Sequence, residues 1–383
     1  GVDGYIFNAS GFSKEQANRR PFECFDHQWI LFDPQLYLTN LDGATCNKTC
    51  AKLSTYPWFG INVPDFDSQE MNHTEWMDHL KASLSWNPSL PNTAADISSI
   101  VNDCLLFQAE FGVTHMIAPT PLVQDPDDQF SVQLQWLSAA AELKNHYNIP
   151  IFATVAISDY LLFPHRPANN LLLGTIIDNL TVNDFDGIYL LVVQEAADTL
   201  RLIDRNIVES LFYISYIAGK MHSKQIIINF ADDLGFACNA IGATAFASGA
   251  TVKQRRMSLV DFIDRGGGSA YPRLYSHSLI GDFLSEDDLT KIRNARLLRL
   301  INRDWTEEAD SLLKALVAGE TANSVPVWRQ SNNNVTQANT HRIVLLKKKI
   351  TDLNSLSTDN QLEAILTWLQ DAEAHTALIN NKL

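Results

Sequence analysis

Four carboxylates in the sequence stand at or directly after the ends of short apolar runs: Asp33, Asp159, Glu195 and Asp232. Two carboxylates in unlike environments can divide into an acid and a base, or an acid and a nucleophile, as in glycosyl-transfer chemistry. We therefore expect Asp33 and Glu195 to form such a pair, with Asp232 as an orienting group. The alternative is structural, because polar residues end many strands and Asp begins many of the helices that follow.

One imidazole adds to this set. His277 lies within the last apolar run before the C-terminal part of the chain. A neutral imidazole at that place could act as a general base, whereas the competing interpretation is a hydrogen-bonded structural histidine. The predicted catalytic residues are thus Asp33, Asp159, Glu195, Asp232 and His277.

A second group of residues could bind an anion. Glycines near positions 249 and 267 expose backbone amides, which can cradle a negatively charged group, and arginines nearby add positive charge. The alternative is a pair of ordinary glycine turns with solvated arginines. The predicted anion-binding or substrate-binding residues are Asn229, Ser248, Gly249, Arg265, Gly267 and Arg273.

The cysteines allow one metal pattern. Cys24-X-X-His27 and Cys46-X3-Cys50 give four ligands in two pairs, as structural zinc sites do. The second spacing is wider than the commonest one, so unrelated thiols are the preferred interpretation, and we predict no metal and no cofactor. The sequence contains no Gly-X-Ser-X-Gly, no Gly-X-Gly-X-X-Gly and no P-loop.

The overall composition limits the partners. The formal net charge is -15, and such a surface disfavours broad binding to nucleic acid or to anionic membranes. No run of 18 apolar residues is present, so no transmembrane helix is expected. Five cysteines in a chain of 383 residues are an odd and sparse set, which indicates a reducing, cytoplasmic location. A small-molecule substrate is the expected partner.

Positioning these residues requires a regular alternation of strands and helices. Predicted strands lie at 29–38, 59–63, 115–119, 149–157, 187–193, 225–230, 244–247 and 273–279. Most are apolar throughout, as in parallel sheets buried on both faces, and helical patterns at 94–111, 131–147, 196–221 and 232–241 separate them. Eight such strands close a TIM-like (β/α)8 barrel, whose functional residues gather at the carboxyl ends of the strands. A doubly wound open parallel sheet is the alternative fold.

The remainder of the chain is predicted to be helical. We expect a barrel domain over 1–283 and a helical C-terminal region over 284–383, with its best helices at 289–301, 306–318 and 361–379. The stretch 321–340 is polar and rich in asparagine, so an exposed loop is expected there. Trp305, Trp328 and Trp368 lie in this region and could dock a protein partner, although core packing is the simpler interpretation.

One segment carries a family resemblance. Residues 226–249 run from a strand through an Asp-Asp-Leu-Gly helix start and an Ala-Ile-Gly to the next strand. This stretch resembles the corresponding part of tRNA-guanine transglycosylase-type barrels, which implies a TIM barrel. Members of that family carry a Cys-X-Cys-X-X-Cys…His zinc cluster near the C-terminus, but this chain has no cysteine after Cys238. No catalytic residue is transferred from the family.

Two functions follow from these patterns. The first is an enzyme that uses carboxylates at the barrel rim, in acid–base or glycosyl-transfer chemistry, on a small polar substrate of phosphorylated, glycosidic or nucleoside-like type. The second is a non-catalytic barrel that acts as a binding or assembly component through its helical tail. Fold class alone does not separate them, because barrels host many functions.

Overall fold

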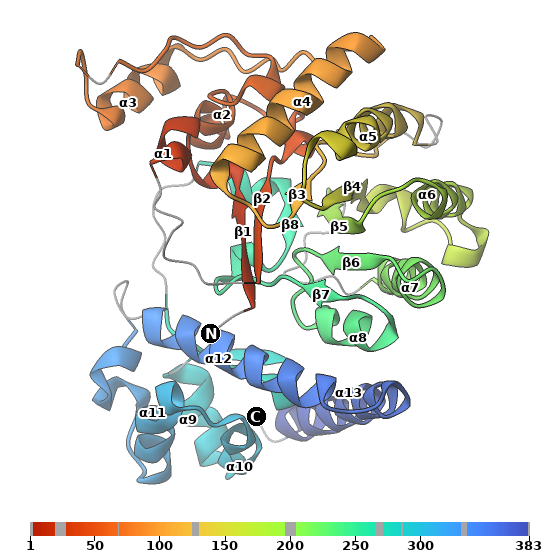
Figure 1. Ribbon diagram of the computed structural model, residues 1–383. Coiled ribbons are helices and arrows are strands. Elements are labelled where there is room, and N and C mark those ends of the chain that lie inside the picture. The colour runs from red at the N-terminus through yellow and green to blue at the C-terminus, as the bar shows by residue number, and fades with distance from the viewer. Residues whose placement is uncertain are drawn as a thin grey trace.

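The protein is an α/β molecule in which a parallel sheet is followed by a helical C-terminal region (Figure 1). The computed structural model describes residues 3–19, 28–67, 69–124, 130–195, 204–264, 271–284, 286–330 and 335–381. The predicted α/β class and the predicted parallel sheet are confirmed.

The parallel strands follow one another in sequence order. The main sheet has the order β3 (Met116–Ile117), β4 (Ile151–Ser158), β5 (Gly187–Gln194), β6 (Gln225–Ile228) and β7 (Ala245–Phe246), and the short β8 (Met257–Ser258) pairs with the end of β5. Strands β1 (Gly4–Asn8) and β2 (Trp29–Asp33) form a separate parallel pair. The amide of Thr114 donates to the carbonyl of Ile30 at 2.8 Å, which places β2 beside the start of β3.

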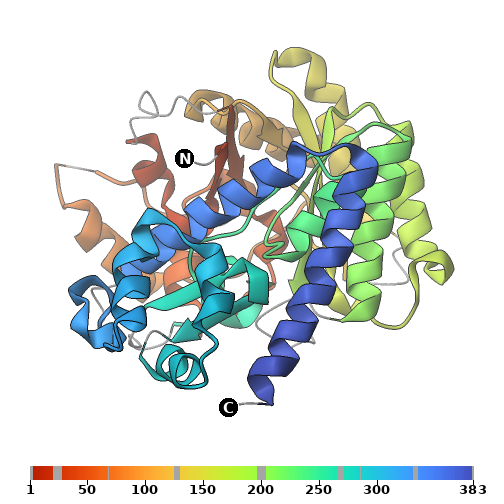
Figure 2. The same cartoon turned by 90° about the horizontal axis from the view of Figure 1, so that it is seen from below.

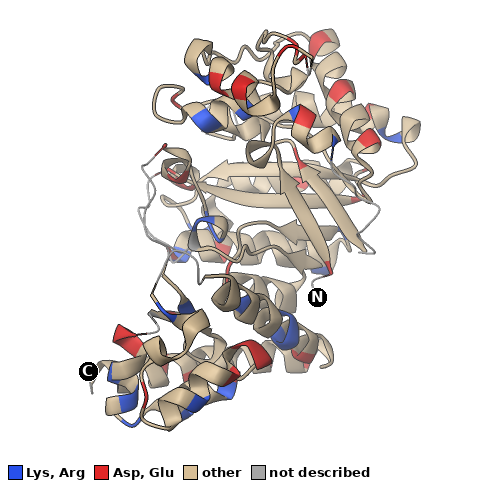
Figure 3. Ribbon diagram, turned by 90° about the vertical axis from the view of Figure 1, so that its left-hand side faces the viewer, with Lys and Arg blue, Asp and Glu red and all other residues tan. Residues whose placement is uncertain are grey.

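The two central strands explain why the sheet forms. Every residue of β4 and β5 is buried, and both strands consist mainly of Val, Ile, Leu, Ala and Phe. Strands with apolar side chains on both faces need cover on both faces, which crossover helices provide in parallel sheets. Figure 3 shows the strands almost free of charged residues, whereas Asp and Glu lie mainly on helices and loops.

Helices connect these strands and cover the sheet from outside, as Figure 1 shows for α4 to α8. Their bounds are α1 (Lys14–Asn18), α2 (Asn47–Leu53), α3 (His73–Ser83), α4 (Ala94–Phe111), α5 (Ser131–Leu143), α6 (Leu171–Val182), α7 (Arg205–Ile214) and α8 (Leu234–Ile241). In α7 the buried residues Ile207, Leu211 and Ile214 recur at helical spacing and form one apolar face. A π-helical turn over Ser215–Met221 continues α7.

The C-terminal region has a hydrophobic core of its own. It contains the antiparallel pair β9 (Arg273–Ser276) and β10 (Gly281–Leu284), then α9 (Asp287–Asn294), α10 (Leu298–Ile301), α11 (Glu307–Val317), α12 (Val335–Asn354) and α13 (Thr358–Asn380). Leu274 and Leu279 of the hairpin pack with Leu289, Leu312 and Trp328. Seen from below, α12 crosses under the parallel strands and α13 lies beside α8 (Figure 2).

Several expectations about the strands were wrong. Strand β1 lies in the N-terminal segment, where none was predicted, and the predicted strand 59–63 is a 3-10 turn (Pro57–Phe59) followed by irregular chain. The predicted eighth strand, 273–279, supplies β9, which pairs antiparallel with β10 because the chain reverses at once around the left-handed Ile280. A closed barrel is not found in the described part of the chain; the parallel strands leave an open side between β7 and β1.

The helical predictions were more accurate. Helix α4 has the predicted bounds, and α5, α8, α11 and α13 differ by a few residues at their ends. The predicted loop 321–340 was wrong over its last residues, which form the start of α12. None of the helices among the described residues is both long and apolar enough to cross a membrane.

Candidate functional site

Asp33 sits at the carboxyl end of β2 inside a small network of hydroxyl groups. Its carboxylate accepts hydrogen bonds from Tyr37 Oη at 2.6 Å and from Tyr189 Oη at 2.7 Å. The side chain of Asn229, at the end of β6, donates to the same Tyr189 hydroxyl. The predicted residues Asp33 and Asn229 are therefore brought together through Tyr189, which rises from β5.

Burial shapes the chemistry of Asp33. Its side chain is fully enclosed, and desolvation raises its pKa from 3.8 to about 6, although the bonds from Tyr37, Tyr189 and the Gln35 amide lower it. A carboxylate accepting only from neutral donors keeps much of its desolvation cost. Asp33 consequently changes charge close to neutral pH, which is the range that acid–base catalysis uses.

The chain holds this arrangement with residues in the left-handed backbone region. Asp33 precedes a proline and so favours an extended backbone, and its Oδ1 accepts the amide of Gln35, which has a φ of 54°. Phe230 and Asp232, just after β6, also have positive φ values of 57° and 44°. Non-glycine residues in this conformation cluster at functional sites in proteins.

Glu195, directly after β5, is hydrogen-bonded to side chains of β4 and of the loop after β3. Its two carboxylate oxygens accept from Gln124 Nε2 at 2.7 Å and from the hydroxyl of Ser158. The side chain of Asn40 in turn donates to Gln124. Ser158 ends β4, Glu195 directly follows β5, and Asn40 and Gln124 lie in the loops after β2 and β3, so one chain of hydrogen bonds links the carboxyl-end regions of four strands.

Asp159 has a supporting place beside Glu195. It is buried, and its Oδ1 accepts the backbone amide of Glu195 at 3.0 Å. This bond fixes the main chain from which the Glu195 side chain projects. The structure therefore brings two predicted catalytic residues, Asp159 and Glu195, into direct contact.

Asp232 belongs to a different group, built around an arginine from the C-terminal region. Arg342 of α12 is buried, donates to Asp232 Oδ1 and donates to Ser248 Oγ at 3.1 Å. Its guanidinium lies over the ring of Tyr275, 4.2 Å from the centroid. Burial alone would lower the pKa of Arg342, but the neighbouring Tyr275 and Asp232 raise it above its usual value.

His277 lies at the far side of this second group. Its Nδ1 is 3.3 Å from the hydroxyl of Tyr275, which also bonds to Asp233, and its ring stacks on Trp368 at 4.4 Å. Burial, with the nearby Lys349, lowers the pKa of His277 to about 3. The imidazole is neutral near pH 7 but is a weak base, so its role as a general base stays a prediction that this pKa does not favour.

The predicted anion-binding residues are dispersed. Gly249 donates its amide to the carbonyl of Gln254 at 3.0 Å, and a Cβ at that glycine would lie 2.0 Å from Gln254 Cβ, so a tight turn already accounts for the glycine. Arg273 is exposed on β9. Arg265 and Gly267 lie outside the described residues. Anion binding at these positions stays a prediction.

The structure describes two of the four residues in the predicted zinc pattern. Cys24 and His27 lie outside the described residues, whereas Cys46 and Cys50 are buried free thiols. Burial raises the pKa of Cys46, and raises that of Cys50 to about 12. Over the described ranges, no three His, Cys, Asp or Glu side chains are grouped to hold a metal ion.

Sequence reasoning missed the partners of the carboxylates. Tyr189 carries the one aromatic hydroxyl within the apolar run of β5. A polar atom among buried apolar residues needs a hydrogen-bond partner, so its sequence position alone could have marked Tyr189 as part of a polar site. Tyr37 follows Asp33 by four residues, a spacing that a helical turn brings together. Arg342 had no such signal, because no separate helix was predicted over 335–354 and the start of α12 was assigned to a loop.

Comparison with known proteins adds no family to this description. The chain matches no protein-family model, and no curated protein matches it either.

Proposed function

We propose that the protein is an enzyme that performs acid–base or glycosyl-transfer chemistry at the carboxyl ends of its parallel strands. One observation carries the proposal: Gln124, after β3, and Ser158, at the end of β4, donate to the half-buried carboxylate of Glu195 directly after β5, and Asn40, after β2, joins them through Gln124. In parallel α/β proteins, ligands bind at this edge of the sheet.

The two carboxylates have different roles in this proposal. Glu195 is the group that reaches the substrate as acid or base, and its bonds to Gln124 and Ser158 orient it. Asp33 is buried behind the strand ends, and because its pKa is about 6, its carboxyl group gains or loses a proton close to neutral pH. Two carboxylates held in unlike environments support a division of this kind.

The substrate class is a small polar molecule of glycosidic or nucleoside-like type. A phosphorylated substrate has weaker support, because Arg255 pairs with Asp282 and Arg256 pairs with Asp261 near the predicted anion site. These ion pairs neutralise the charge that would attract a phosphate.

The architecture behind this proposal is an opened (β/α)8-like barrel, with α12 on the open side. Lys347 of α12 pairs with Asp3, just before β1, and Arg342 of the same helix bonds to Ser248, just after β7. One helix thus bridges the two outer strands. The division at 283 and the cytoplasmic location stay predictions.

The test uses Glu195→Gln, which keeps the shape of the side chain and removes its charge. Hydrolysis of a panel of fluorogenic glycosides and nucleosides is measured for the wild type, for this variant, and for Glu142→Gln on the exposed face of α5. Loss of a general acid or base typically lowers kcat by about 10²- to 10⁴-fold. We expect that loss for Glu195→Gln only. Turnover that is unchanged in this variant, or absent for every panel member, would contradict the proposal.

The alternative function, a binding or assembly role of the C-terminal helices, is favoured by a groove along α13. The three tryptophans predicted to dock a partner lie in different environments. Trp328 is buried in the core, Trp305 is exposed and its indole N–H donates a hydrogen bond to Asp310, and Trp368 lines the groove. A binding role does not exclude catalysis at Glu195, because the groove residues are different from those around Glu195.

A further inference from the structure

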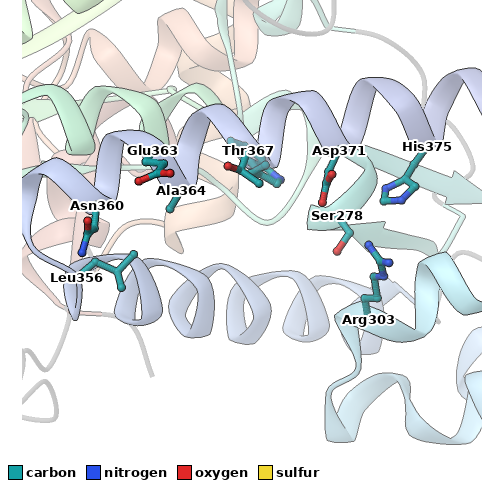
Figure 4. Close-up of a pocket in the computed structure, with 10 residues that line it drawn as sticks. Ser278, Arg303, Leu356, Asn360, Glu363, Ala364, Thr367, Asp371 and His375 are labelled. Carbon is teal, nitrogen blue, oxygen red and sulfur yellow. The ribbon is translucent and has the colours of Figure 1, made fainter.

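A groove of about 560 Å³ runs along one face of α13. Figure 4 shows side chains of α13 projecting into it, with Ser278 and Arg303 facing them near one end. The groove is lined by Ser278, Arg303, Leu356, Asn360, Glu363, Ala364, Thr367, Trp368, Asp371 and His375. From Asn360 to His375 the helix rises roughly 22 Å, which is the length of an extended peptide of about seven residues.

Trp368 is a fixed aromatic wall of this groove. Its ring is stacked on His277 with an interplanar angle of 7°, and its indole N–H donates to the His277 carbonyl at 2.7 Å. Phe236 packs against the same ring at 5.8 Å. A tryptophan held in one orientation loses little conformational entropy on binding, and such residues anchor many protein interfaces.

The charge along the groove is mainly negative. Glu363 and Asp371 line it from α13, and in the described part of the chain neither forms an ion pair. Residues 358–380 include four carboxylates and no Lys or Arg. Arg303 is the one cation among the lining residues, and it stands at the end near His375.

We propose that this groove binds a basic, partly apolar segment of a partner protein. The aliphatic stem of a Lys or Arg side chain lies against Trp368, and its charged end lies between Glu363 and Asp371. Cations are attracted both to the face of an indole and to carboxylates. Leu356 and Ala364 offer apolar surface at the other end, which suits a neighbouring aliphatic side chain of the same segment.

The test measures binding of a short acetylated peptide of alternating Lys and Leu by titration calorimetry at low salt. A second peptide carries Gln in place of Lys, and spermine is titrated as a free polycation. The groove variant is Glu363→Gln with Asp371→Asn. The matched control is Asp359→Asn with Glu373→Gln, which removes the same charge from exposed positions of the same helix outside the groove.

We expect the Lys peptide to bind the wild type and the control, and to lose at least about tenfold in affinity for the groove variant, roughly 1.4 kcal/mol. The Gln peptide should bind more weakly than the Lys peptide. Equal weakening in both variants would assign the binding to the overall negative charge and overturn the proposal. Spermine binding as tight as that of the peptide, or no peptide binding at all, would overturn it as well.

Discussion

Asp33 and Asp232 are the same residue type, and both are buried near the carboxyl end of a parallel strand, Asp33 as the last residue of β2 and Asp232 shortly after β6, yet their surroundings differ. Asp33 accepts hydrogen bonds only from neutral groups in the described structure, two tyrosine hydroxyls and a backbone amide. Asp232 instead meets the buried guanidinium of Arg342. The strand end places the carboxylate, but the element packed across from it decides whether the carboxylate meets a cation.

This difference separates a group suited to titration from one suited to structure. The pKa of Asp33 is raised to about 6 because burial is not offset by a cation. The pairing of Asp232 with Arg342 links the strand ends to α12 by a charge-assisted hydrogen bond. Of the two, Asp33 is the better candidate for a role that depends on proton transfer.

The largest expected effect comes from removing the cation. Arg342→Met removes the guanidinium that pairs with the buried Asp232, and breaking a buried pair in this way typically costs about 3–5 kcal/mol. The free energy of unfolding is measured by urea titration at pH 7. A loss below about 1 kcal/mol would mean that Asp232 is well solvated without Arg342, and the contrast with Asp33 would then be unfounded.

The second prediction removes the charge of Asp33. Because its folded pKa is raised, the unfolded state releases the proton first, and wild-type stability falls as the pH rises from 3.8 to about 6. The rise in the pKa of Asp33 from 3.8 to about 6 corresponds to a loss of roughly 3 kcal/mol in the free energy of unfolding. Asp33→Asn has no carboxyl group that titrates in this range. As the pH rises from 4 to 7, the unfolding free energy of the variant minus that of the wild type therefore increases by roughly 3 kcal/mol.

Urea titrations of both proteins across this pH range provide the check. An unfolding free energy difference between wild type and Asp33→Asn that is constant with pH would show that Asp33 does not titrate in this interval.

A smaller effect is expected from Tyr37→Phe. The hydrogen bond that Tyr37 Oη donates to Asp33 at 2.6 Å lowers the pKa of Asp33. Tyr37→Phe removes this bond, so the pKa of Asp33 rises further. The lost hydrogen bond to the ionised carboxylate costs about 1.5–3 kcal/mol at pH 8 and less at pH 5, where Asp33 is protonated. Unfolding free energies at the two pH values are compared. An equal loss at both would indicate a packing effect rather than an electrostatic one.

The smallest effect belongs to the outer contact of α12. Lys347 pairs with Asp3 at the surface, and exposed ion pairs of this kind contribute about 0–1 kcal/mol. Lys347→Ala should change the urea midpoint only slightly, in contrast to Arg342→Met on the same helix. A large loss for Lys347→Ala would show that the position of α12 depends on its surface contact as much as on the buried one.

The sequence carried enough information for the central strands but not for the N-terminal strand, nor for which strands pair with one another. The wholly apolar runs of β4 and β5 predicted buried parallel strands correctly, because burial on both faces leaves that pattern. Strand β9 was also predicted as a parallel strand, but it pairs antiparallel with β10. Local apolarity records burial and does not record which neighbour a strand will pair with.

The candidate site was predictable in part for a related reason. Asp33, Asp159 and Glu195 follow apolar runs, so a local rule located them. Their partners, among them Gln124 and Tyr189, lie far away in the chain: Tyr189 is 156 residues from Asp33. Contacts over such separations depend on the tertiary arrangement, which no local pattern specifies.

The pairing of Asp232 with Arg342 spans 110 residues, and this separation affects the order in which the protein matures. During synthesis the parallel strands leave the ribosome before α12 does, and domains commonly fold in the order of their emergence. The guanidinium of Arg342 therefore reaches Asp232 only after α12 has been synthesised, so the contact that joins the end of β6 to α12 cannot form before the parallel strands are all in place along the nascent chain.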